Sequence, residues 1–147
     1  MCNYLDCRNE IDDKKLQEVA NIIRQGGIVV FPTETVYGIG TNGLDSKAIS
    51  KVYHVKQRPL NKPISLLVSS LEMVKAVTEN ISDIEYKLME EFFPGPLTII
   101  LKKNKLVPNN LTNNTDTVGI RLPDNIIARK LIEYANVPIA TPSANIS

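Results

Sequence analysis

The chain has 147 residues, 43% of them hydrophobic, which is enough to build one domain with a real core and predicts a single unit over residues 1–147. The net charge is +1, no apolar run approaches the ~18 residues of a membrane span, and the acidic N-terminal stretch lacks the apolar region of a secretory signal. One histidine and two cysteines in no standard zinc spacing exclude a metal centre built on several histidines, so we expect a soluble, cytoplasmic protein without a protein-bound metal.

The first predicted helix is capped by Asp12 or Asp13 and ends at the pair Gly26-Gly27. Its apolar face consists of Leu16, Val19, Ala20 and Ile23. A short apolar strand over residues 28–31 follows at once. A polar segment then begins where this strand ends, and small-ligand sites gather at such strand ends in open α/β sheets.

That polar segment is the run Phe31-Pro-Thr-Glu-Thr-Val-Tyr-Gly38. Thr33 and Thr35 are two residues apart, so in extended backbone their hydroxyls face the same side. The hydroxyls could hold a polar small molecule, or the two residues could simply continue the strand, since β-branched residues are common there. The chain contains no P-loop motif, so any ATP would bind without one.

The second predicted helix is capped by Ser46. Its inward face consists of Ala48, Ile49, Val52 and Tyr53. Five cations and no acid lie between Ser46 and Lys62, which favours an anionic ligand such as a phosphate. We expect Lys56 and Arg58 to lie beyond the helix end, in extended backbone before Pro59, with both charges facing one way. A solvated loop with little structural role is the alternative interpretation.

The rest of the chain alternates short strands and helices. Strands are predicted over residues 64–68, 97–101, 117–121 and 138–140, and helices over residues 70–76, 82–91 and 125–135. Ser82 and Glu85 form a capping box at the start of one of these helices. The polar stretch 104–116 is predicted to be a loop. Because strands interleave with helices and two strands follow back to back, we expect an α/β fold with a mixed sheet.

Two further positions have side chains that could bind a ligand. Arg121 ends the strand 117–121, where a cation must be paired, either with a structural acid or with a substrate carboxylate. Residues 141–145, Thr-Pro-Ser-Ala-Asn, directly follow the last strand. The hydroxyl of Ser143 and the amide of Asn145 suit recognition of a phosphate or a base edge, although Pro, Ser and Asn are also typical of an ordinary turn.

Five motifs together resemble the YrdC family of threonylcarbamoyl-AMP synthases in order and spacing, from about Lys14 to the last residue. They are residues 32–38, Lys56-x-Arg58, residues 93–98, residues 116–121 and residues 142–145. The resemblance implies a twisted mixed sheet with flanking helices around a positively charged cavity. It also implies a nucleotidyltransferase that makes threonylcarbamoyl-AMP from L-threonine, bicarbonate and ATP, releases pyrophosphate, and serves the threonylcarbamoyladenosine modification of tRNA.

The resemblance also implies residue roles. The implied L-threonine ligands are Thr35, Leu67, Arg121 and Thr141. Among these, Arg121 would bind the carboxylate, and Leu67 stands where the family often has histidine. The implied catalytic residues are Lys56, Arg58, Ser143 and Asn145. The implied ATP contacts are Arg58, Lys62 (through its backbone), Thr117 and Ser143, with Mg²⁺ accompanying the triphosphate.

Other interpretations stay open at this stage. The domain could be a non-enzymatic RNA-binding module, although net charge is near zero and only 5% of residues are aromatic. It could also belong to a larger hydrogenase-maturation protein that embeds a similar module. Further partners implied by the resemblance are tRNA or tRNA-modification proteins. Since family members continue past the Ser-Ala-Asn motif, we expect the 147 residues alone to self-associate and to release little pyrophosphate.

Overall fold

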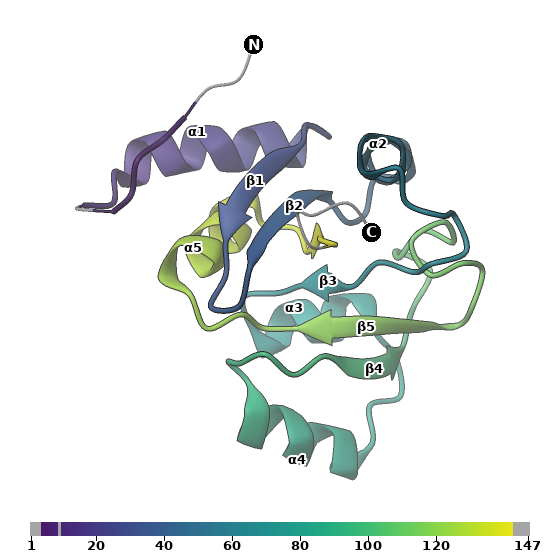
Figure 1. Cartoon of the computed structure of the whole chain (residues 1–147). Helices are drawn as coiled ribbons and strands as arrows, with labels where there is room; N and C mark the ends of the chain where they lie inside the picture. The colour runs from purple at the N-terminus through teal and green to yellow at the C-terminus, as the bar shows by residue number, and fades with distance from the viewer. Residues whose placement is uncertain (1–3, 9, 143–147) are drawn as a thin grey trace.

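Strands and helices alternate along the chain much as the hydrophobic pattern predicts (Figure 1). The computed structural model describes residues 4–8 and 10–142. Within these residues the helices are α1 (Asp13–Arg24), α2 (Ser46–Lys56), α3 (Leu71–Val77), α4 (Asp83–Phe92) and α5 (Ile126–Ala135). The strands are β1 (Val29–Pro32), β2 (Tyr37–Asn42), β3 (Leu66–Leu67), β4 (Ile99–Lys102), β5 (Thr117–Arg121) and β6 (Ile139–Ala140). None of the helices in these ranges is long and apolar enough to cross a lipid bilayer.

The strands form one sheet in the order β1-β2-β6-β3-β5-β4 across the described residues. β3 and β5 run parallel, with Leu66 opposite Ile120, and the other neighbouring pairs are antiparallel. A parallel pair needs a crossover connection, which the segment containing α3, α4 and β4 supplies. The sheet is therefore mixed, as predicted.

Helices cover both faces of this sheet. Consecutive residues of a strand point to opposite faces, and the two leucines of β3 enter different hydrophobic clusters. Leu66 packs with side chains of α2, α3 and α4, including Val52 and Val74. Leu67 packs with side chains of α1 and α5, including Leu16 and Leu131. Since burying one such side chain contributes about 1.5–3 kcal/mol, the two clusters fix the sheet against both helix layers.

Side-chain caps set the helix starts. Asp12 caps α1, and Ser82 and Glu85 form the predicted capping box of α4. The start of α2 differs from the prediction, because Asp45 rather than Ser46 is the cap. The Asp45 carboxylate accepts hydrogen bonds from two backbone N–H groups of the first turn, at 3.0 and 3.2 Å. An aspartate one residue earlier can reach these N–H groups from extended backbone, which is the geometry a cap requires.

Strand β2 is the element that the sequence analysis missed, because residues 32–45 look like a polar loop. It pairs with β1 on one side and with β6 on the other. Its glycines allow this close packing. A Cβ atom at Gly38 would lie 2.6 Å from Cγ2 of Thr141, and one at Gly40 would lie 2.6 Å from Cγ2 of Ile139. The strand is therefore held by backbone pairing and by its neighbours rather than by its own hydrophobic side chains.

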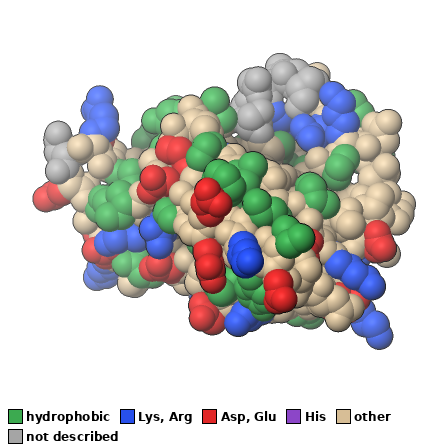
Figure 2. All heavy atoms as spheres, turned by 90° about the horizontal axis from the view of Figure 1, so that it is seen from below, with side chains coloured by type: hydrophobic (Ala, Val, Ile, Leu, Met, Phe, Trp, Pro, Cys, Tyr) green, Lys and Arg blue, Asp and Glu red, His purple; other side chains and the backbone are tan. Residues whose placement is uncertain are grey.

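The outward face of α4 is both apolar and acidic. Ile84, Leu88 and Phe92 are exposed on successive turns of the helix and form one stripe. Figure 2 views the molecule from this side and shows hydrophobic and acidic side chains interleaved. The acid-rich segment 79–91 of the sequence is thus a solvated surface, on a different part of the fold from the cations that follow α2.

Candidate functional site

The turn between β1 and β2 carries the two threonines of the polar run. The Thr33 hydroxyl accepts hydrogen bonds from the backbone N–H groups of Thr35 and Val36, at 3.3 and 3.2 Å. The hydroxyls of Thr33 and Thr35 lie 3.1 Å apart. The two side chains therefore face the same side, as predicted, but a tight turn rather than extended backbone brings them together.

The guanidinium of Arg121, at the end of β5, lies against this turn. Its Nη2 group forms an ion pair with the Glu34 carboxylate and donates to the Thr35 hydroxyl at 3.3 Å. Its Nε group donates to the Gly95 carbonyl at 3.2 Å. The side chains of Arg121 and Glu34 are only 15% and 22% exposed, so the pair is largely removed from water. Of the two kinds of partner expected for Arg121, the structure supplies the structural acid.

One end of the Arg121 guanidinium remains available to a ligand. An arginine carries five N–H donors in a planar fork, and the contacts above engage Nε and Nη2. Within the described part of the chain, Nη1 donates no hydrogen bond. Since guanidinium N–H groups form strong, charge-assisted hydrogen bonds with carboxylates, the geometry permits a ligand carboxylate at Nη1, close to the hydroxyl of Thr35.

Thr141 and Leu67 lie on the same face of the sheet as Arg121. Leu67 is opposite Arg121 in the register of β3 and β5 and opposite Ile139 in that of β3 and β6. Thr141 follows Ile139 by two residues and therefore points to the same face. Leu67 is buried, and Thr141 lies against Gly38. The structure thus brings Leu67, Arg121 and Thr141 onto one face, with Thr35 in the hairpin turn at its edge.

Lys56 is the last residue of α2 rather than a loop residue, and only 3% of its surface is exposed. Its Nζ atom makes no hydrogen bond in the part of the chain that the structure describes. Burial lowers the pKa of Lys56, and the positive charge of Arg58 lowers it further. A buried ammonium without a partner is energetically costly, so this geometry favours an anion as the missing partner.

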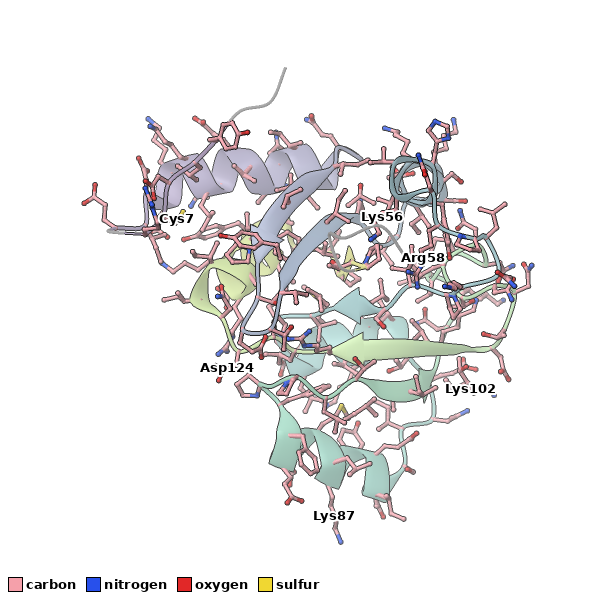
Figure 3. All side chains as sticks on the ribbon, viewed as in Figure 1. Cys7, Lys56, Arg58, Lys87, Lys102 and Asp124 are labelled. Carbon is pink, nitrogen blue, oxygen red and sulfur yellow. The ribbon has the colours of Figure 1, made fainter. Side chains whose placement is uncertain are left out.

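Arg58 follows α2 and folds back over its own loop. Gln57 adopts a left-handed conformation with φ of 53°, so the prediction that residues 56–58 are extended is wrong. Arg58 donates from Nε and Nη2 to the carbonyls of Lys62 and Pro63, at 3.4 and 3.0 Å. Figure 3 shows the side chains of Lys56 and Arg58 between α2 and β5. Both cations therefore lie near the sheet, although not in the predicted backbone geometry.

The predicted ATP contacts not yet placed are Thr117 and Ser143, and Asn145 is the remaining predicted catalytic residue. Thr117 is exposed at the start of β5, at the opposite end of that strand from Arg121. Ser143 and Asn145 lie outside the described residues. The structure therefore defines the surroundings of Arg121 more fully than those of the predicted ATP contacts.

Two adjoining clefts open beside α2. The larger, of about 430 Å³, is lined by Ser50, Tyr53, His54, Gln57, Arg58 and Leu60. The smaller, of about 300 Å³, shares three of these residues and adds Asn110, Asn113 and Asn114. Arg58 is the one Lys or Arg among these lining residues, so the positively charged cavity stays a prediction. In residues 4–8 and 10–142, no group of three His, Cys, Asp or Glu side chains is arranged to hold a metal ion.

The fold and these groups of residues define a class of protein. It is a mixed α/β domain. At one end of β5 it has an arginine that is paired with an acid and lies beside hydroxyl groups, and at the end of α2 it has two further cations. The family model Sua5/YciO/YrdC, described as telomere recombination, matches residues 21–147. The chain belongs to this family, and the resemblance predicted from the five motifs is confirmed.

Relatives of the chain include enzymes and solved structures. Over 147 residues the chain is 42% identical to the threonylcarbamoyl-AMP synthase of Pyrococcus abyssi, covering 100% of itself and 43% of that protein. The crystal structure of P. abyssi Sua5 complexed with L-threonine matches with a TM-score of 0.92 and 42% identity, over 95% of this chain and 41% of the other. The crystal structure of Escherichia coli YciO matches with a TM-score of 0.79 and 28% identity, over 89% and 64% of the two chains. The chain thus spans less than half the length of the P. abyssi proteins.

Glu34 is the candidate residue that the sequence analysis did not single out. It lies between the two threonines of the polar run and is the only acid between Glu18 and Asp45. That isolation was a usable signal, because the arginine at the end of strand 117–121 needed an acidic partner. The two residues are 87 positions apart in the chain, so only the fold could pair them.

Proposed function

We propose that this chain carries the L-threonine site and part of the ATP site of a threonylcarbamoyl-AMP synthase. Such a nucleotidyltransferase joins L-threonine, bicarbonate and ATP and releases pyrophosphate. The proposal is supported by family membership and by 42% identity with the P. abyssi enzyme. Because the chain spans 43% of that enzyme, the proposal concerns the enzyme to which these 147 residues contribute.

The arrangement of Arg121 and Thr35 is the observation that carries the proposal. The carboxylate of L-threonine binds the available Nη1 end of Arg121, beside the Thr35 hydroxyl 3.3 Å from Nη2. Leu67 and Thr141, on the same face, contact the rest of the amino acid. Support comes from the matching structure of P. abyssi Sua5, which was determined as a complex with L-threonine.

The phosphates of ATP are the anions that the cations near α2 bind. The proposed set is the two cations Lys56 and Arg58, together with the backbone of Lys62 and the polar side chains of Thr117, Ser143 and Asn145. A triphosphate beside Lys56 stabilises the charged form of its side chain and therefore raises the pKa that burial has lowered. ATP enters as its Mg²⁺ complex. Mg²⁺ usually keeps several of its waters and is bound through substrate phosphates together with one or two carboxylates.

The proposed reaction needs three positioned reactants rather than an enzyme nucleophile. The amino group of threonine forms a bond with the carbon of bicarbonate, water leaves, and a carbamate results. A carbamate oxygen then attacks the α-phosphorus of ATP, and the bond from that phosphorus to the departing pyrophosphate breaks. Arg121 holds a carboxylate that does not react, whereas Lys56 and Arg58 stabilise negative charge on the phosphates.

We place this reaction in the cytoplasm, where the product supplies the threonylcarbamoyl group for threonylcarbamoyladenosine in tRNA. tRNA or tRNA-modification proteins are then the proposed partners that receive the product. The proposed reaction needs no membrane, since each substrate is a small water-soluble molecule.

Isothermal titration calorimetry tests the threonine site directly. L-threonine should bind the chain, L-serine should bind more weakly because it lacks the methyl group, and Arg121→Ala should abolish or strongly weaken both signals. Pyrophosphate release from ATP, L-threonine and bicarbonate by the enzyme to which these residues contribute tests the full reaction, with each reactant omitted in turn. No threonine binding and no threonine-dependent pyrophosphate would reject the proposal.

A salt series separates the proposed enzyme from an RNA-binding module. Binding to an RNA backbone weakens steeply as the salt concentration rises. Such binding releases counterions from the phosphates, and this release contributes less free energy when the solution already holds more salt. Threonine binding in a site where the arginine is already paired should change little between low and high salt. RNA binding with a steep salt dependence, and no response to threonine, would favour the module instead.

A further inference from the structure

Glu34 connects separate segments of the chain around Arg121. One carboxylate oxygen pairs with Arg121, and the other accepts a hydrogen bond from the backbone N–H of Asp124 at 2.7 Å. Arg121 in turn donates to the carbonyl of Gly95, whose N–H donates to the carbonyl of Leu122 at 2.9 Å. The hairpin turn, the end of β5, the residues before α5 and the loop before β4 therefore meet around a single ion pair.

The hairpin turn depends on this ion pair for its position. β1 is at the edge of the sheet, and β6 pairs with β2 at Thr41 and Asn42, the end of β2 that lies away from the turn. Among the described residues, the hydrogen bonds that leave residues 33–36 for other segments are those of Glu34 to Arg121 and Asp124 and that of Thr35 to Arg121. Without Glu34, the turn would keep one hydrogen bond to the rest of the protein.

We propose that Glu34 is a positioning residue for the amino-acid site, an inference that rests on the proposed function. It holds Arg121 so that Nη1 faces the ligand, and it holds the turn so that Thr35 stays beside the guanidinium. It also balances the charge of Arg121, which is only 15% exposed. The site therefore offers a ligand carboxylate a fixed hydrogen-bonding edge rather than a mobile cation.

The alternative role for Glu34 is competition. A carboxylate that already occupies Arg121 could block the ligand and have to leave before L-threonine binds. The two roles predict opposite results for Glu34→Gln, which keeps the shape and one acceptor oxygen but removes the charge. If Glu34 positions Arg121, this variant binds threonine more weakly than the parent. If Glu34 competes, the variant binds threonine more tightly.

The experiment compares Glu34→Ala, Glu34→Gln and Arg121→Ala by calorimetry with two probes, L-threonine and L-threoninol, which lacks the carboxylate. The parent should prefer L-threonine, and the ratio of the two dissociation constants measures the carboxylate contact. We expect Glu34→Ala to weaken L-threonine binding by about tenfold, equivalent to about 1.4 kcal/mol, and to reduce the ratio toward that of Arg121→Ala. Glu34→Gln should fall between the parent and Glu34→Ala.

Asp13→Asn is the matched control. Asp13 is also an acid that joins two elements, because its Oδ1 accepts hydrogen bonds from Lys130 Nζ and the Tyr134 hydroxyl, both at 2.7 Å. These contacts lie between α1 and α5, apart from the hairpin turn. Asp13→Asn can lower thermal stability, but it should leave the threonine-to-threoninol ratio unchanged. A general loss of stability is thereby separated from a change at the amino-acid site.

The outcomes distinguish this inference from the proposed function. If the parent binds no L-threonine, the proposed function fails and this inference fails with it. If the parent binds L-threonine but Glu34→Ala and Glu34→Gln keep its affinity and ratio, the positioning role alone is overturned. Tighter binding by Glu34→Gln also overturns positioning, in favour of competition. Should Glu34→Ala not fold, Glu34→Gln alone decides between these results.

Discussion

The cation at the end of β5 and the cation at the end of α2 have very different surroundings. Arg121, at the end of β5, is held by an acid, a hydroxyl and a carbonyl. Lys56, at the end of α2, is buried with no hydrogen-bond partner for its Nζ atom in the described residues. In Figure 3, Lys56 and Arg58 lie below α2, whereas Asp124 marks the opposite end of β5, near the arginine and its acid.

This difference matches the charges of the two proposed ligands. L-threonine carries no net charge near neutral pH, so a neutralised arginine can bind its carboxylate without attracting more highly charged anions. A triphosphate carries several negative charges, and a lysine without an acidic partner can be matched by one of them. The contrast predicts that removing an interaction of Arg121 lowers the affinity for L-threonine. It also predicts that the charge of Lys56 is stabilised only when an anion is bound.

The largest expected effect is that of Arg121→Ala on the affinity for L-threonine at the proposed amino-acid site. A charge-assisted hydrogen bond contributes about 1.5–3 kcal/mol, so the affinity for L-threonine should fall about ten- to hundredfold. Glu34 also loses its partner, which should lower the melting temperature. Calorimetry and thermal unfolding measure the two effects. Lys47→Ala, an exposed cation on α2, is the control, and equal affinity in both variants would contradict the threonine assignment.

Gly38→Ala should disturb the proposed amino-acid site by crowding Thr141. The new Cβ would lie 2.6 Å from Cγ2 of Thr141, so Thr141 must move. Overpacking of this kind costs about 1–3 kcal/mol, and we expect a lower melting temperature together with weaker threonine binding. Gly27→Ala is the matched control, because its Cβ would lie 2.4 Å from Cγ2 of Ile22, between α1 and β1 and apart from the hairpin turn. A larger loss of threonine affinity in the control would show that Thr141 does not line the site.

Arg58→Ala should lower the free energy of unfolding as well as weaken the proposed ATP site. The sequence analysis left a small structural role open for this loop residue, but Arg58 donates to the carbonyls of Lys62 and Pro63. Each such bond contributes about 0.5–1.5 kcal/mol, so unfolding should become easier by about 1–2 kcal/mol. Threonine affinity should not change. Urea unfolding and calorimetry check both parts, and an unchanged unfolding midpoint would show that these hydrogen bonds contribute little in solution.

Lys56→Met should have the smallest effect on stability, and in the opposite direction. Burial lowers the pKa of Lys56 below its ordinary value of 10.5 in the folded state. Between the folded pKa and 10.5 the unfolded chain binds more protons, so this residue makes stability rise with pH across that window. Below the window the buried charge destabilises the fold, and Lys56→Met removes that cost.

The measurement for Lys56→Met is the melting temperature of parent and variant from pH 7 to pH 10. We expect the variant to be as stable as the parent or more stable at pH 7, with the difference shrinking as pH rises. In the enzyme to which these residues contribute, the same substitution should abolish pyrophosphate release if Lys56 contacts phosphate. A variant that is less stable at pH 7 would indicate that the Lys56 ammonium is paired in solution.

Local patterns predicted most of the elements. The capping box of α4 and the strand 117–121 were confirmed as predicted, and Leu16, Ala20 and Ile23 of the predicted apolar face of α1 are buried. These features depend on residues within a few positions of each other, so spacing alone reveals them. The five motifs likewise identified the family, because their order along the chain is a property of the sequence.

Only the tertiary structure decided how the site is assembled. β2 has few apolar side chains and is held by pairing with strands from both ends of the chain. The burial of Lys56 and the pairing of Glu34 with Arg121 also join distant segments. The sequence determined which chemical groups are present and which local elements carry them. The fold determined which charges are paired and which are buried without a partner in the described residues, because burial and ion pairing depend on neighbours that are far apart in the chain.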